Sequence, residues 1–174
     1  MQKQIALVTG LIFLLSVFAA CQSKPSPPAS ATCDLGGGKT IKTDYSSPRM
    51  KGRKIYGDLV PFGKVWRTGA NEATTFVTSG DVVVGGKSVP AGSYTIFTVP
   101  NADKWTLIIN KETGQFHLNY NSALDFGRTK MNLKHLDAPV ETFRVDLRSE
   151  GGNKGTLALV WENTEASIPF LVLP

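Results

Sequence analysis

The chain has 174 residues, 41% of them hydrophobic and 19% charged, and a formal net charge of +5. The length fits one domain of about 100–200 residues, and the composition excludes global disorder. So small a positive charge does not by itself indicate nucleic-acid binding, and we expect no nucleic-acid partner.

The first twenty residues have the features of an export signal. Lys3 supplies a short basic region, and the apolar run 5–20 is shorter than the ~20 residues of a membrane-spanning helix. The sequence Phe18-Ala19-Ala20-Cys21 then resembles a lipobox, with Phe where Leu is usual. We therefore expect residues 1–20 to be a lipoprotein signal peptide and Cys21 to be lipidated. Plain cleavage after Ala20, which would give a secreted protein, is the alternative.

This signal predicts a location in the bacterial cell envelope, with the domain facing the periplasm or the cell exterior. A diacylated or triacylated Cys21 would anchor the chain stably, because stable anchoring needs more than one acyl chain. With Cys21 lipidated, Cys33 has no partner within the chain and is read as an incidental thiol. Without lipidation, a Cys21–Cys33 bridge is available in an oxidising compartment.

Residues 21–38 predict a tether between the anchor and the folded domain. Ser, Pro and Ala dominate residues 22–32, and three consecutive glycines at 36–38 end the segment. We therefore place the folded domain at residues 39–174.

From residue 39 onward, short segments of alternating polarity follow one another between turn signals. In residues 140–147, for example, Phe143 and Val145 lie on one face and Arg144 and Asp146 on the other. Pro139 predicts a break before this segment, and residues 121–127 have room for one helical turn. About nine such strands predict an all-β fold, an antiparallel β-sandwich, although a barrel has the same strand spacing.

The stretch 54–75 is the densest in polar side chains suited to a site. Its three glycines permit sharp turns, and Pro61 excludes a helix or a central strand around it. We expect tight corners that present Arg67, Asn71 and Glu72. One interpretation is a polar pocket that binds a ligand. The other is structural, with an Arg67–Glu72 ion pair and Asn71 bonded to the backbone of the turn.

Basic residues are concentrated in the same part of the chain. Residues 39–67 contain eight Lys or Arg against two acids, Asp44 and Asp58. A basic patch of this kind favours anionic lipid, lipopolysaccharide or an acidic glycan. A solvated, lysine-rich loop is the alternative.

Signatures of catalysis, metal binding and cofactor binding are missing from the sequence. It has no GxSxG, HExxH, P-loop or dinucleotide-binding pattern. The two histidines, His117 and His135, lack metal-ligand spacing and are read as structural. We expect no metal and no cofactor. Trp105 and Trp161 are expected in the core, whereas Trp66 is expected either in the core or on a glycan-stacking surface, with the core favoured.

Several runs of residues together carry a resemblance to a known family. The most specific is Trp-Arg-Thr-Gly-Ala-Asn-Glu-Ala-Thr at 66–74, and further runs lie at 47–49, 51–57, 59–65, 90–94, 96–100, 105–106, 110–111 and 161–162. Over residues 39–174 the chain resembles the bacterial family known as domain of unknown function 2911. The family often has Trp-Gly where this chain has Phe116-His117. The resemblance implies an exported or lipid-anchored protein and supplies no activity.

These observations favour a non-catalytic binding module for a glycan, an envelope component or a protein partner. Its candidate ligand surface consists of Tyr56, Trp66, Arg67, Asn71 and Glu72. The first alternative is a hydrolase of envelope polymers, in which Glu72 works with a second carboxylate, Asp58 or Asp125. The second alternative is a structural scaffold without a ligand.

Overall fold

The computed structural model describes residues 26–114 and 119–174, and nine strands dominate this part of the chain. The strands are β1 (Pro28–Asp34), β2 (Thr40–Ser46), β3 (Thr74–Thr78), β4 (Val82–Val84), β5 (Lys87–Val89), β6 (Gly92–Val99), β7 (Trp105–Asn110), β8 (Asp125–Gly151) and β9 (Lys154–Val172). A single 3-10 turn, η1 (Ser122–Leu124), precedes β8 where one helical turn was expected. The all-β prediction is confirmed.

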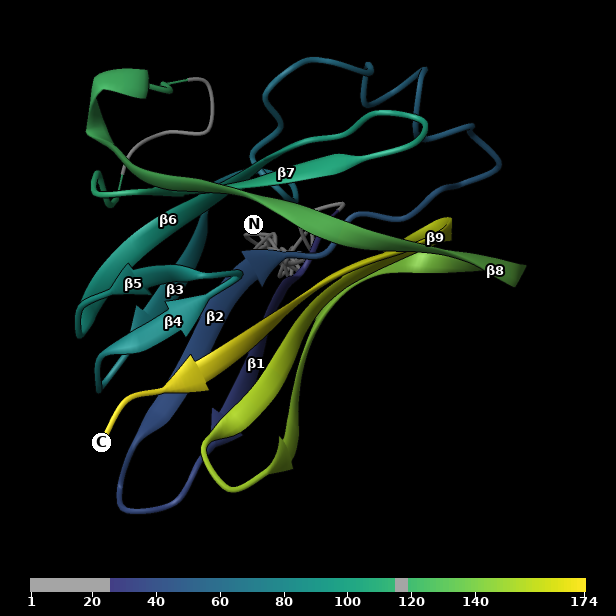
Figure 1. Cartoon of the computed structure of the whole chain (residues 1–174). Helices are drawn as coiled ribbons and strands as arrows, with labels where there is room; N and C mark the ends of the chain where they lie inside the picture. Colours follow the sequence, from purple (N-terminus) through teal and green to yellow (C-terminus); the bar gives the residue numbers. More distant parts are fainter. Residues whose placement is uncertain (1–25, 115–118) are drawn as a thin grey trace, which may run out of the picture.

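All nine strands join one antiparallel sheet in the order β1-β2-β3-β6-β7-β8-β9-β4-β5. The long strand β8 connects its two parts, because its first residues pair with β7 and its later ones with β9. The β8–β9 register shifts between His135 and Val140 and again before Arg144. Pro139 therefore lies in an irregularity within a strand, where a missing amide donor is tolerated, and does not end the strand as expected. Figure 1 shows β8 and β9 curving so that the sheet folds over on itself.

The folded domain begins before residue 39. Residues 28–34, which we assigned to the tether, form β1 and pair with β2 along its whole length. Small side chains at Ala29 and Ala31 face inward with Cys33, which is buried opposite Ile41. The tether prediction is therefore wrong for residues 28–34. Cys33 belongs to the core, and burial raises the pKa of its thiol. The predicted signal peptide and the lipidation at Cys21 lie outside the described residues.

The core fills the space enclosed by the folded sheet and is rich in aromatic rings. Trp105 and Trp161 are almost fully buried there, as expected. Phe143 from β8 packs edge-on against Tyr45 of β2, so the two parts of the sheet meet across this core. Large apolar side chains on both parts supply most of the stabilisation, because their removal from water is the dominant favourable term in folding.

The long connection between β2 and β3, residues 47–73, lies at one end of the sheet (Figure 1). Backbone bonds fix it at several points: Trp66 exchanges two with Thr98 of β6, at 2.7 and 2.9 Å, and Arg49 forms a bridge with Thr142 of β8. This connection carries all five residues of the candidate ligand surface, Tyr56, Trp66, Arg67, Asn71 and Glu72. No helix in the described part of the chain is long and apolar enough to cross a membrane.

Candidate functional site

Two of the predicted site residues, Tyr56 and Trp66, lie in the aromatic core. The Trp66 ring stacks on Trp161 with centroids 6.0 Å apart, and its Nε1 donates to the Gly69 carbonyl at 3.2 Å. The Tyr56 ring meets Trp105 edge-on at 4.7 Å. Burial, with a smaller contribution from Glu162, raises the pKa of Tyr56. The core interpretation of Trp66 is confirmed. Both rings attach the connection to the core by packing against its tryptophans.

The turn after Trp66 has an unusual backbone that separates neighbouring side chains. Thr68 and Asn71 have φ angles of 59° and 55°, in a region that L-residues seldom adopt. Hydrogen bonds hold the turn: Thr74 Oγ1 donates to the Thr68 carbonyl at 2.7 Å, and the Thr68 and Thr98 hydroxyls lie 3.1 Å apart. A Cβ at Gly69 would lie 3.0 Å from the Ser46 carbonyl oxygen, so only glycine fits there without movement of the backbone.

Arg67 is half-buried and lacks the ion pair that the structural interpretation gave it. Within the described part of the chain, no ion pair joins Arg67 to Glu72. The Arg67 Nε is buried without a hydrogen-bond partner. Desolvation by burial lowers the pKa of this guanidinium. A donor that has left water without finding an acceptor costs free energy, and the low pKa reflects the same loss of water around the charge.

Arg67 lines a depression of about 340 Å³ at the end of the sheet. A second guanidinium, that of Arg53, lines it too and is held in place by bonds to the carbonyls of Met50 and Arg49 at 2.9 and 2.8 Å. The full lining consists of Ser26, Pro48, Arg53, Leu59, Val60, Trp66, Arg67, Gly69, Ala70 and Trp161. None of these lining residues is acidic. Two arginines and two tryptophans, Trp66 and Trp161, on one lining suit an anionic group such as a carboxylate or a phosphate.

Asn71 connects the turn to the beginning of the described chain. Its Nδ2 donates to the Ser26 carbonyl and to the Ser46 hydroxyl, both at 3.1 Å. Ser46 in turn donates to Glu72 Oε2 at 3.4 Å. Asn71 therefore has a structural role, although its partners are distant in sequence and not the turn backbone as we expected.

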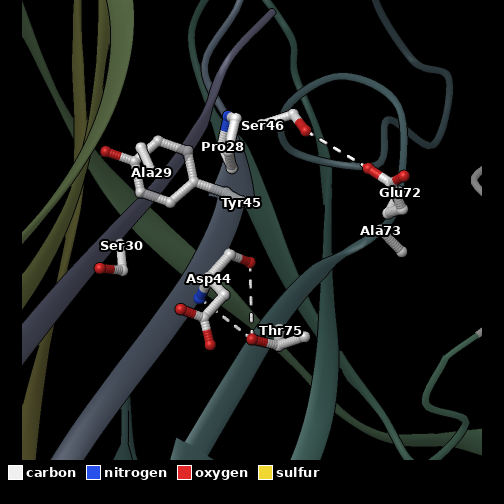
Figure 2. A pocket seen from close by; sticks show the side chains of 9 residues that line it. All are labelled: Pro28, Ala29, Ser30, Asp44, Tyr45, Ser46, Glu72, Ala73 and Thr75. Atoms are coloured by element: carbon white, nitrogen blue, oxygen red, sulfur yellow. Dashed lines mark hydrogen bonds between the residues drawn. The ribbon is translucent and has the colours of Figure 1, made fainter. Parts of the chain in front are cut away.

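Glu72 lines a different depression, of about 380 Å³, between β1, β2 and the start of β3. Figure 2 shows Glu72 beside Ser46, while the other carboxylate on the lining, Asp44, lies near Thr75. Neither Asp58 nor Asp125 lines this depression. The second carboxylates named for a hydrolase thus do not share a cavity with Glu72. The full lining is Pro28, Ala29, Ser30, Asp44, Tyr45, Ser46, Glu72, Ala73 and Thr75.

Glu162 has a role that the sequence did not indicate. Its carboxylate accepts hydrogen bonds from the backbone amides of Ile55 and Tyr56, at 3.0 and 3.2 Å. Its own backbone is left-handed, with φ of 52°. Glu162 thereby fixes the connection that carries the two arginines to β9. The partners are more than a hundred residues apart in sequence, so no local pattern identifies them.

The structure offers no metal centre among the residues it describes. No group of three or more His, Cys, Asp or Glu side chains in residues 26–114 and 119–174 is arranged to bind an ion. His135 is exposed at the irregular part of β8. His117, and with it the departure at Phe116-His117, falls in the short segment that the structure leaves undescribed.

Comparison with known proteins gives a family and no activity. No curated protein and no solved structure is similar to this chain at a significant level. A family model described as a protein of unknown function matches residues 26–170. The match begins just before β1, which agrees with the earlier start of the folded domain. The chain therefore belongs to the DUF2911 family, as the residues around Trp66 indicated.

Proposed function

We propose that this protein is a non-catalytic binding module of the bacterial cell envelope, anchored through lipid on Cys21, and that it binds an anionic group of an envelope component. An acidic glycan is the ligand class that best suits the site. The proposed binding site is the depression lined by Arg67 and Arg53. Tyr56, Trp66 and Asn71 support it by fixing the connection around it.

The observation that carries this proposal is the half-buried guanidinium of Arg67. Its Nε has no hydrogen-bond partner, and the residues that line its depression include no acid. An arginine kept only for stability would normally have a carboxylate or carbonyl partner at such a site, because buried polar groups are almost always hydrogen-bonded. A bound carboxylate or phosphate would pair with the accessible part of this guanidinium and offset the cost of its desolvation.

The test is thermal unfolding of residues 22–174 with glucuronate and glucose 6-phosphate as anionic probes and glucose as the neutral control. We expect both anions to raise the melting temperature and glucose to leave it unchanged. A ligand at a hundred times its Kd stabilises the folded state by about 2.7 kcal/mol, which is readily measured.

Two variants make this test specific. Arg67→Met should abolish the effect of the anions, since it removes the fork and keeps much of the side-chain volume. Arg144→Met is the matched control, because Arg144 is exposed and already paired with Asp146 at 3.1 Å. An equal response of both variants to the anions would rule out the Arg67 depression as the site.

A further inference from the structure

The connection between β2 and β3 has an outer surface that combines basic and apolar side chains. Six basic residues lie in the segment 49–67, against one acid, Asp58: Arg49, Lys51, Arg53, Lys54, Lys64 and Arg67. None of these six forms an ion pair with another residue that the structure describes. All except Arg67 are exposed. Their charge is therefore available to an external partner.

Large apolar side chains are exposed in the same segment. Leu59, Phe62 and Val65 have 46%, 42% and 39% of their surface exposed, although core residues of the same types are almost fully buried. In the described part of the chain only one other large hydrophobic residue is comparably exposed, Leu124 at 36%. The three are held on a rigid turn, because Val60 bonds to Ile55 and Gly57, and Gly63 bonds to Pro100. Apolar side chains among lysines and arginines are typical of proteins that rest on an anionic membrane.

The position of the N-terminus links this surface to the proposed anchor. Ser26 bonds to Asn71 and lines the same depression as Arg53 and Leu59. Cys21 precedes Ser26 by five residues, a length of chain that spans at most about 18 Å. A lipid on Cys21 would therefore hold this end of the domain close to the bilayer. The β8–β9 hairpin lies at the opposite end of the molecule (Figure 1).

We propose that the surface formed by Arg49, Lys51, Arg53, Lys54, Leu59, Phe62, Lys64 and Val65, here called the basic loop surface, lies against the headgroups of an anionic bilayer. The lysines and arginines contact lipid phosphates, and Leu59, Phe62 and Val65 enter the interface. The inference rests on the proposed anchor at Cys21 only for orientation. Charge and apolar exposure provide an independent argument for docking.

The orientation is tested with residues 22–174, which contain every residue of the hydrophobic core. A hexahistidine tag in place of Cys21 tethers this chain to vesicles of phosphatidylcholine, phosphatidylglycerol and a nickel-chelating lipid. In a Cys33→Ala background, a polarity-sensitive dye is attached to Phe62→Cys or, as the matched control, to Ser149→Cys near the opposite hairpin. We expect blue-shifted emission and quenching by brominated lipid at position 62 only. Equal signals at both positions, or none at position 62, would overturn the proposal.

The chemistry of docking is tested without the tag. Untagged residues 22–174 should cosediment with vesicles that contain phosphatidylglycerol and not with pure phosphatidylcholine. Reversing two charges, Lys51→Glu with Lys64→Glu, should weaken this binding by at least about tenfold, since each basic residue near the surface contributes on the order of 1 kcal/mol. Phe62→Asp should weaken it as well. The matched controls are Lys130→Glu with Lys154→Glu, and Leu124→Asp, which should bind as the wild type does.

The anchor is tested separately, by palmitate incorporation in cells that express the full chain or its Cys21→Ala variant. Docking of the untagged chain without palmitate labelling would support the proposed basic loop surface and reject the proposed anchor. Palmitate labelling without any preference for anionic vesicles would retain the anchor and reject the docking surface. Failure of the two proposals is therefore distinguishable.

Discussion

Two arginines, Arg67 and Arg128, occupy opposite electrostatic situations in this fold. Arg128 on β8 bonds to Asp125 at 2.7–2.8 Å and to the Tyr120 hydroxyl, and Asp125 also accepts from Asn110 at 2.9 Å. Hydrogen bonding to Asp125 raises the pKa of Arg128, whereas burial lowers that of Arg67. The polar groups of the Arg128 cluster are hydrogen-bonded to one another. A contribution to stability is therefore sufficient to explain them. The Arg67 Nε has no hydrogen-bond partner among the described residues, which makes the Arg67 depression the better candidate for binding.

The largest loss of stability is expected when Trp66, which lines the Arg67 depression, is removed. Trp66→Ala should lower the free energy of unfolding by about 3–5 kcal/mol, because it removes a buried ring and leaves a cavity. Denaturant titration followed by circular dichroism measures the change. Trp66→Phe, which keeps a ring, should cost clearly less. A loss below about 1 kcal/mol in the alanine variant would contradict the core assignment of Trp66.

A smaller loss is expected when the Arg128 cluster is broken at its centre. Asp125→Ala deprives three donors of an acceptor, those of Asn110, Tyr120 and Arg128. Its side chain is only 11% exposed, so the free energy of unfolding should fall by about 1–3 kcal/mol. Arg128→Met, at the exposed rim, should cost at most about 1 kcal/mol. Equal losses in the two variants would mean that the cluster is not organised by its carboxylate.

Arg67→Met sharpens the comparison because it should change stability by less than about 1 kcal/mol in either direction. The variant removes a desolvated charge that has no carboxylate partner among the described residues, so little favourable interaction is lost. Melting temperatures of the wild type and the Arg67→Met, Arg67→Ala and Glu72→Ala variants provide the measurement. A drop of several degrees in all three would assign the turn to architecture alone.

The last expected effect is a pH dependence at the Arg128 cluster, which appears only at alkaline pH. Burial first, and then the bond to Asp125, raise the pKa of Tyr120 from 10.0 to about 12. The folded chain therefore keeps this proton to higher pH than the unfolded chain does. The contribution to stability is complete below pH 10 and is lost as the pH rises from there towards 12. Tyr120→Phe should flatten the alkaline fall in the melting temperature. An unchanged slope would contradict the shift.

Local patterns were sufficient for most strands and failed where side chains were small. The alternation around Phe143 identified the inner face of β8, because period two follows from strand geometry alone. The strand β1 was missed because Ala29 and Ala31 contribute little hydrophobic signal within a Ser- and Pro-rich segment. Its burial depends on pairing with β2 and contact with β8.

The same distinction applies to the candidate site, whose local features were predictable from the sequence and whose long-range contacts were not. Its location in the connection between β2 and β3, its glycine turns and its excess of basic residues were readable from the sequence, because each is a property of residues near one another in the chain. The sequence did not show which polar groups are in contact. Left-handed backbone at Thr68 and Asn71 leaves Arg67 and Glu72 on the linings of separate depressions, although five positions separate them.

The sequence by itself thus determined the all-β class, the turn chemistry and the family, since local backbone preferences and residue patterns are sufficient for each. Only the tertiary structure decided that Glu162 fixes the connection, that Ser26 lies beside Asn71 and that the Arg67 Nε has no acceptor. The physical reason is that hydrogen bonding and desolvation depend on which distant segments the folded sheet brings together. Those contacts arise from the path of the whole chain and not from any one stretch of it.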